Sequence, residues 1–319
     1  MTVEYLQCVL LMRYILFNNN FFLLGVTSKM VIDKSYKLNH IELSVLENKE
    51  AASSETVFLA LHGWLDNAAS FEKIIKCFPD LPWCSMDFSG HGFSEHRPAG
   101  CFYHLWDYVL DVVQLIDQIG SNVCLVGHSM GGAVAMLVAA IAPEKVSALI
   151  VLDNTGPLTI EKTERVSRLQ KSIRSMNKVQ NKRKHQYSSL DDMIQARMQG
   201  FTPLSYQAAK ALVLRGSQLD VDNWYRWQHD PKLWLATPFP MDKASVDAFT
   251  AQIHCPTLLL FARKGIYQNN ETLVDQRVKS ISKKTIKWLE GSHHFHLEED
   301  TYLDVCNEIK AFITQNKIQ

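Results

Sequence analysis

Short apolar runs alternate with longer amphipathic segments along most of the chain from residue 55 onward. Six runs have the length of strands and carry apolar or β-branched residues at successive positions: 56–63, 83–88, 122–127, 148–153, 256–262 and 285–291. Continuous apolar runs of this length are typical of strands buried on both faces of a parallel sheet. Residues 30–47 predict a further pair of strands ahead of them.

Helical patterns fill the spaces between these runs. Residues 104–120 repeat apolar positions at helical spacing and end in Gly120, whereas residues 130–142 are apolar on every side and stop before Pro143. The second segment therefore predicts a helix buried against the sheet. Strands that alternate with helices indicate the α/β class, with a mostly parallel sheet flanked by helices.

Residues 155–253 break this alternation and lie between two predicted core strands. We expect them to form an inserted helical cap that covers one edge of the sheet. The core is then divided into a first part, residues 30–154, and a second part, residues 254–319.

Residues 1–29 are apolar but interrupted. Arg13 and the asparagines at 18–20 keep every run below the roughly 18 apolar residues that a membrane-spanning helix needs. Glu4 near the start and the arginine within the segment do not fit a signal peptide. We favour an over-extended gene start, so that the fold begins near Met30, with a targeting segment as the alternative.

Basic and aromatic residues concentrate in the expected cap. Val166, Leu169, Ile173 and Met176 recur at helical spacing, and lysines and arginines fill the other face of that predicted helix. We interpret the basic residues as a solvated face; recruitment of an anionic substrate is the alternative. The aromatic-rich stretch 222–240 predicts packing between cap and core, or an apolar acyl pocket.

The segment "LVGHSMGG" joins a predicted strand directly to the buried helix. It contains the pentapeptide GxSxG, with Gly127 and Gly131 on either side of Ser129. A serine at such a strand-to-helix corner is held in a strained turn, and the small glycines let strand and helix approach closely. The pattern predicts that the Ser129 hydroxyl projects above the sheet as a nucleophile.

A serine hydroxyl needs a base to remove its proton, and "LEGSHHFHLEED" offers three histidines after the last predicted strand. His293, His294 and His296 are the candidates, because a loop at the carboxyl end of a strand faces the ligand crevice. A nucleophile of this kind also needs an oxyanion hole. The amides of Met130, after the serine, and Trp64, after the strand in "LALHGW", are the expected donors.

Composition narrows the function classes. Basic and acidic residues number 33 each, so the net charge supplies no broad attraction to nucleic acid or to an anionic membrane. The seven cysteines include no CxxC pair, which indicates neither a zinc site nor a disulfide framework and favours a reducing, cytoplasmic location. We expect no metal, no organic cofactor, no nucleic-acid partner and no requirement for a membrane partner.

Several motifs together resemble the α/β-hydrolase superfamily over residues 35–315. The most specific of them resemble its branch of serine hydrolase-like proteins: "LHGWLDNAASF", "MDFSGHGFSEHRP", "GHSMGG", "WYRWQHDPKLW" and "CPTLLLFARKG". The resemblance implies an α/β-hydrolase sheet with an inserted helical cap and the chemistry of an esterase. It implies a type of reaction but does not identify a single physiological substrate.

The resemblance also selects among the histidines. The family pattern GHxxHL places its catalytic histidine three residues before the second one, which here implies His293. His294 and His296 are then expected to be packing or hydrogen-bonding residues.

The chain departs from the commonest superfamily pattern at the acid. That residue usually follows the strand here written "PTLLLFA", but this chain has Arg263, Lys264 and Gly265 there. Haloalkane dehalogenases of the same fold often take the acid from the end of the preceding strand, where this chain has Asp153. We expect Asp153 to orient the imidazole, with Asp275 as the alternative; a purely structural Asp153 would instead bind the amides of residues 154–156.

These residues predict a serine hydrolase that cleaves a small carboxylic ester or thioester through an acyl-enzyme on Ser129. The alternatives are a carbon–carbon bond hydrolase with the same triad and a non-catalytic ligand-binding protein of this fold. Dehalogenase and epoxide-opening chemistry are disfavoured, because those reactions use an aspartate nucleophile.

Overall fold

The computed structural model describes residues 31–48, 56–120, 122–179, 185–268 and 270–318. The chain divides into two units, residues 1–30 and residues 31–319. The expectations for residues 1–29 lie outside the described residues. No helix in the described ranges combines the length and the apolar character needed to cross a bilayer.

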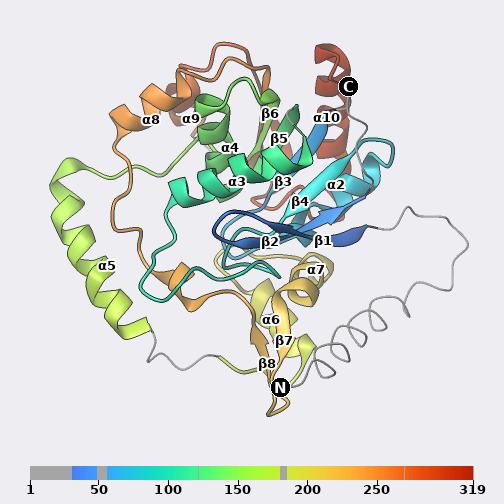
Figure 1. The fold of residues 1–319 in the computed structure, drawn as a ribbon. Coiled ribbons are helices and arrows are strands. Elements are labelled where there is room, and N and C mark those ends of the chain that lie inside the picture. The colour runs from blue at the N-terminus through green and yellow to red at the C-terminus, as the bar shows by residue number, and fades with distance from the viewer. Residues whose placement is uncertain (1–30, 49–55, 121, 180–184, 269, 319) are drawn as a thin grey trace, which may run out of the picture. The chain divides into compact units, whose positions relative to one another are not determined.

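An eight-stranded sheet forms the centre of the second unit (Figure 1). Its first two strands pair antiparallel, as do the second and its neighbour β4, whereas the remaining pairs are parallel. The predicted mostly parallel α/β fold is therefore confirmed. In spatial order the strands are β1 (Ile32–Lys37), β2 (Glu42–Glu47), β4 (Trp83–Met86), β3 (Val57–Leu61), β5 (Val123–His128), β6 (Val146–Leu152), β9 (Thr257–Lys264) and β10 (Lys284–Ser292).

Helices cover both faces of this sheet, and the side chains of β3 show why. Val57, Leu59 and Leu61 join one hydrophobic cluster, while Phe58 and Ala60 join the other, since successive side chains of a strand point to opposite faces. Helices α3 (Leu105–Ile119), α4 (Met130–Ile141) and α9 (Glu271–Val278) contribute to the first cluster. Helices α2 (Glu72–Cys77) and α10 (Tyr302–Asn316) contribute to the second.

A disulfide joins Cys77 on α2 to Cys306 on α10, 229 residues apart in the sequence. The expectation that the cysteines form no disulfide is wrong for this pair. Packing of α2 against α10 brings the two residues together, and their spacing in the sequence contains no sign of it. The number and spacing of the cysteines therefore do not by themselves point to a reducing compartment.

The chain leaves the sheet after β6 and returns to it at β9. We call residues 155–253 the insertion. Its helices α6 and α7 pack on each other around a third hydrophobic cluster, which Leu297 joins from the loop after β10. Its short strands β7 and β8, which the sequence did not predict, pair antiparallel. The insertion contains η2 (Lys162–Glu164), α5 (Arg165–Val179), α6 (Leu190–Met198), α7 (Tyr206–Gly216), β7 (Ser217–Leu219), β8 (Tyr225–Trp227), η3 (Pro231–Trp234) and α8 (Lys243–Thr250).

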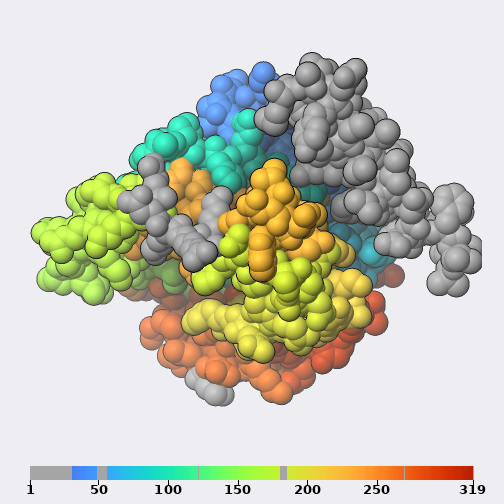
Figure 2. Space-filling view, turned by 90° about the horizontal axis from the view of Figure 1, so that it is seen from below, coloured from blue at the N-terminus to red at the C-terminus, as the bar shows by residue number. Residues whose placement is uncertain are grey.

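Helix α5 forms as predicted but turns an unexpected face to the protein. Val166, Leu169 and Ile173 are 69%, 44% and 48% exposed, whereas Ser172 is buried and donates a hydrogen bond to the Ala236 carbonyl. Figures 1 and 2 both place α5 apart from α6 and α7. The apolar periodicity thus predicted the helix correctly but not the direction in which its apolar side chains point.

Candidate active site

Ser129 lies at the corner between β5 and α4. Its backbone has a φ of 50° and a ψ of −120°, a conformation that is strained for a residue with a Cβ atom. Strand and helix meet so closely that a Cβ added to Gly127 would lie 2.4 Å from the Gly131 carbonyl oxygen. One added to Gly131 would lie 2.0 Å from the carbonyl oxygen of Leu61. The structure thus places Ser129 at the predicted strand-to-helix turn. Gly127 is required by that turn, and Gly131 by the close approach of α4 to the neighbouring strand β3.

His293 and Asp153 form a buried pair at the carboxyl ends of β10 and β6. The His293 Nδ1 atom lies 2.6 Å from Asp153 Oδ2, and neither side chain is more than one tenth exposed. An ionised carboxylate only accepts hydrogen bonds, so Nδ1 carries the proton and donates it to this contact. The opposite ring nitrogen, Nε2, is then left as the basic atom.

The Asp153 carboxylate is held by the end of β9 and by the loop that follows it. The amide of Ala262 donates to Oδ1 at 3.2 Å, and the amide of Ile266 donates to Oδ2 at 3.0 Å. A Cβ added to Gly265 would lie 2.3 Å from Oδ2. The segment that usually carries the acid of this fold therefore supplies two amide donors here, and Gly265 leaves room for a carboxylate that comes from the end of β6.

The alternatives for the acid do not match this geometry. Asp275 is exposed on α9, while Asp153 is fully buried against His293. The amide of Gly156 bonds to Asn154 and not to Asp153, so Asp153 does not hold the start of the insertion through that amide. The structure therefore brings Asp153, and not Asp275, to the imidazole.

His128 connects the turn that carries Ser129 to the loop that carries His293. Its Nε2 atom donates to the His293 carbonyl oxygen at 2.9 Å, and the two ring centroids lie 4.6 Å apart. Within the described ranges, no hydrogen bond joins the Ser129 hydroxyl to His293. Such contacts are often long in a ligand-free site and shorten when a substrate binds.

The two expected oxyanion donors follow neighbouring parallel strands, β3 and β5. Met130 is the first residue of α4, so its amide has no acceptor within the helix and lies at the positive end of the helix dipole. The Trp64 indole donates to the Leu233 carbonyl at 3.0 Å and meets Trp234 edge-on. Trp64 thus connects the loop after β3 to the insertion.

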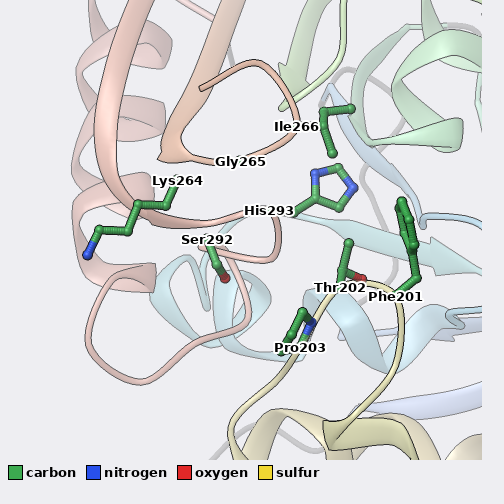
Figure 3. A pocket seen from close by; sticks show the side chains of 8 residues that line it. All are labelled: Phe201, Thr202, Pro203, Lys264, Gly265, Ile266, Ser292 and His293. Atoms are coloured by element: carbon green, nitrogen blue, oxygen red, sulfur yellow. The ribbon is translucent and has the colours of Figure 1, made fainter. Parts of the chain in front are cut away.

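A cavity of about 210 Å³ lies beside the imidazole (Figure 3). The His293 ring lies between Ile266 on one side and Phe201 and Thr202 on the other, and the Lys264 amine points away from it. The walls come from the insertion and from the loops after β9 and β10: Phe201, Thr202, Pro203, Lys264, Gly265, Ile266, Ser292 and His293.

Three further imidazoles lie buried behind His293. Burial lowers the pKa of His128 and His296 well below the usual value, and the neighbouring imidazoles lower both further. Burial also lowers the pKa of His294, against the attraction of Asp66. Burial therefore favours the neutral form of all three imidazoles. His296 bonds to Ser70 and His294 to Asp66, so the hydrogen-bonding roles predicted for them are confirmed.

Asp66 is the acceptor at the centre of this region, and the sequence analysis did not single it out. It accepts from His294 Nε2 at 2.9 Å and from the Arg197 guanidinium at 3.0 Å. Burial alone would raise its pKa, but His294 and Arg197 hold the pKa of the Asp66 carboxyl well below its usual value. Asp66 is consequently a buried anion, and no spacing in the sequence relates it to either partner.

By distance alone, one group among the described residues could hold a metal ion. Ligand atoms of Asp66, His128 and His294 lie within 4.8 Å of one another. The Arg197 guanidinium, however, lies 3.0 Å from Asp66 and 3.5 Å from His294 Nε2. A cation already occupies the neighbourhood and opposes a second one, so we assign these residues to a hydrogen-bonded network.

Comparisons with known proteins agree with this geometry. The family model described as "alpha/beta hydrolase fold" matches residues 56–300. A serine hydrolase-like protein of Danio rerio is 31% identical over 250 residues, which are 75% of this chain and 76% of that protein. One from Dictyostelium discoideum is 29% identical over 277 residues, 83% of this chain and 76% of that protein.

Solved structures share the fold. A hypothetical protein of Pseudomonas aeruginosa PAO1 superposes with a TM-score of 0.83 at 32% identity, over 89% of this chain and all of that one. A thioesterase domain from the curacin biosynthetic pathway superposes with a TM-score of 0.75 over 88% of this chain and 99% of the domain. At 19% identity the second likeness concerns the fold alone.

Proposed function

Because the chain belongs to the α/β-hydrolase fold family, in the branch of the serine hydrolase-like proteins, we propose that it hydrolyses a carboxylic ester or thioester through an acyl-enzyme on Ser129. The observation that carries this proposal is the buried contact of 2.6 Å between Asp153 and His293, whose ring lines a cavity. Ser129 directly follows His128, whose imidazole donates a hydrogen bond to the His293 carbonyl oxygen.

In the first half-reaction, the Ser129 hydroxyl oxygen attacks the acyl carbonyl carbon while His293 Nε2 takes the hydroxyl proton. The carbonyl oxygen becomes an oxyanion that accepts hydrogen bonds from the amides of Met130 and Trp64. The intermediate then collapses, the bond to the alcohol or thiol breaks, and His293 returns the proton to that leaving group. The acyl group remains on Ser129.

Water completes the cycle by the same steps. His293 takes a proton from a water molecule as its oxygen attacks the acyl carbon, and returns that proton to the Ser129 oxygen as the acid leaves. Asp153 stays ionised throughout, keeps the proton on Nδ1 and stabilises the imidazolium that forms twice in each cycle. Every proton moves between the substrate, water and groups of the chain.

The cavity favours a small substituent near the reacting carbon. Its volume of about 210 Å³ is small beside the roughly 300–1,000 Å³ of pockets that hold drug-sized ligands. Apolar side chains of Phe201, Pro203 and Ile266 form much of its wall. We therefore propose that short acyl chains are hydrolysed faster than long ones.

Labelling with an active-site-directed fluorophosphonate tests the proposal. Wild-type protein should gain one phosphonyl group, which peptide mapping should assign to Ser129, and Ser129→Ala should gain none. Ser167→Ala, which removes an exposed serine of α5, should be labelled like the wild type. A panel of esters of increasing acyl length then measures the chain-length preference.

Two outcomes contradict the proposal. Absence of labelling, together with absence of ester or thioester hydrolysis, would make the chain a ligand-binding protein of this fold. Labelling of Ser129→Ala at the wild-type rate would move the nucleophile elsewhere.

A further inference from the structure

Arg197, at the end of α6, makes contacts in three directions from a single guanidinium group. Its Nη1 atom donates to the Thr202 carbonyl at 3.1 Å. Its Nη2 atom donates to Asp66 Oδ1 at 3.0 Å and lies 3.5 Å from Nε2 of His294. The side chain is only 14% exposed, so these contacts are largely shielded from water.

Each of the three partners belongs to a different wall of the proposed active site. Thr202 lines the cavity from the insertion, across from the His293 ring (Figure 3). Asp66 lies two residues after Trp64, in the loop that carries one proposed oxyanion donor. His294 directly follows the proposed base. Arg197 therefore bonds the insertion directly to the loop after β3, and through Asp66, whose other oxygen accepts from His294, to the loop after β10.

The charge on Asp66 makes these contacts strong. The Asp66 side chain is 1% exposed and accepts from both Arg197 and His294 on its two oxygens. Removing either partner of a buried pair leaves an uncompensated charge, which is costly. The separation between the insertion wall and the two loops is consequently fixed by a bonded group and not by apolar contact alone.

We propose that Arg197 is a positioning residue. Through Asp66, it holds the part of the insertion that lines the cavity at Thr202 against two loops: the one after β3, which carries Trp64, and the one after β10, which carries His293. This inference rests on the proposed function, because it assigns Arg197 an effect on turnover and on acyl-chain selectivity. A second ion pair of the insertion provides the matched control. Arg165 and Asp242, 2.8 Å apart, join two parts of the insertion and are not among the residues lining the cavity.

Hydrogen–deuterium exchange measures the connection itself and needs no enzyme activity. Arg197→Met should speed exchange in two peptides, one covering residues 62–68 and one covering residues 199–204. Arg165→Met should leave both peptides at the wild-type rate. Unchanged exchange in Arg197→Met would overturn the proposal, whether or not the protein is a hydrolase.

Kinetics measure the consequence. Arg197→Met and Asp66→Asn should each lower kcat/KM by about tenfold or more. In both variants kcat for the shortest ester should fall, and kcat/KM should differ less between short and long acyl chains than it does in the wild type. Arg165→Met should change neither. In the double variant the loss should be no larger than in the worse single variant, because both changes remove one interaction. Additive losses would overturn the proposal, since independent effects add.

Arg197→Lys separates the contact with Asp66 from the contact with the Thr202 carbonyl. A lysine ammonium can still pair with Asp66, but it lacks the planar fork that binds Asp66 and the Thr202 carbonyl together. We expect kcat for the shortest ester to be restored toward wild type, while the acyl-length preference stays flattened. If Arg197→Lys behaves like Arg197→Met in both respects, the assignment of Asp66 as the link is overturned.

The two proposals fail differently. If fluorophosphonate does not label wild-type protein at Ser129, the proposed function fails, and the exchange experiment still decides the connection. If Ser129 is labelled and the exchange changes, but Arg197→Met matches wild type in labelling rate, kcat and acyl-length preference, the positioning role alone fails.

Discussion

Asp153 reaches the imidazole from β6, one strand earlier than the usual acid of this fold, and two backbone amides hold it there. Asp153→Asn should lower kcat by about 10⁴-fold, because an amide no longer enforces a proton on Nδ1 of His293. Steady-state hydrolysis of a short ester measures the effect. Asp275→Asn, on the exposed surface of α9, should retain wild-type turnover. A larger loss in Asp275→Asn than in Asp153→Asn would reverse the assignment.

Gly265 lies against the same carboxylate, and its missing side chain leaves the space that Asp153 fills. Gly265→Ala should lower kcat by about a hundredfold, since the added methyl group displaces the carboxylate by an ångström or so and that misplacement is costly. The matched variant is Gly100→Ala, whose methyl group would meet nothing within 4 Å. Its φ of 84° makes an alanine there strained, so this variant should lower stability and leave kcat at the wild-type value. Equal turnover in both variants would mean that Asp153 does not depend on this space.

The sequence predicted those side chains whose position follows from local structure. Ser129 lies at a strand-to-helix turn that GxSxG and the two flanking apolar runs define within residues 122–142. Asp153 and His293 each lie at the end of a predicted strand, where parallel strands bring their carboxyl ends to one edge. Asp66 and Arg197 are 131 residues apart, and each resembles an ordinary charged loop or helix residue until the fold brings them together.

Among the elements, the buried ones were predicted best. Runs such as 122–127 and 148–153 are apolar on both sides because both faces of the strand are covered, so their pattern is distinctive. Strands β7 and β8 have three residues each, too few to produce a period. Helix α5 has a clear period, but a helical period does not specify what the apolar face contacts.

Helix α7 is joined to the core by another buried cation. Arg215, near its end, bonds to Asp33 of β1 and to Asp87 after β4, and its side chain is 4% exposed. Arg215→Met should lower the free energy of unfolding by about 3–5 kcal/mol, because two carboxylates lose their partner. Urea unfolding followed by tryptophan fluorescence measures it.

The control for this prediction is Lys243→Met, which removes the exposed partner of Asp247 on α8. Exposed pairs contribute little, so its unfolding midpoint should stay near that of the wild type. Comparable shifts in the two variants would mean that burial does not determine the strength of the Arg215 contacts.

Over the whole molecule, the proposed catalytic groups come from four separate stretches of the chain. Trp64, Ser129, Asp153 and His293 follow β3, β5, β6 and β10, four strands whose carboxyl ends lie along one edge of the sheet. Because the sheet must form before these loops meet, the geometry of the site depends on the stability of the entire core. Conditions that weaken the core are therefore expected to weaken the site as well.

Acid is such a condition, because burial lowers the pKa of six histidines among the described residues. Five of them are buried in the core: His62, His91, His128, His294 and His296. In the unfolded chain a histidine has a pKa near 6.5 and takes up a proton below it, whereas the folded protein keeps these side chains neutral. The unfolded state therefore binds more protons, and stability is lost as the pH falls below about 6.5. A histidine that stays neutral in the folded protein throughout this range contributes about 1.4 kcal/mol of loss between pH 7.5 and 5.5.

Urea unfolding at several pH values in this range measures the slope. His296→Gln should reduce the slope by about one proton, because it removes one of the groups that titrate only in the unfolded chain. Ser70→Ala removes the hydrogen-bond partner of His296 but no titrating group, so it should lower stability and leave the slope at the wild-type value. A wild-type slope in His296→Gln would show that His296 is already protonated in the folded protein, and the buried imidazoles behind His293 would then carry charge.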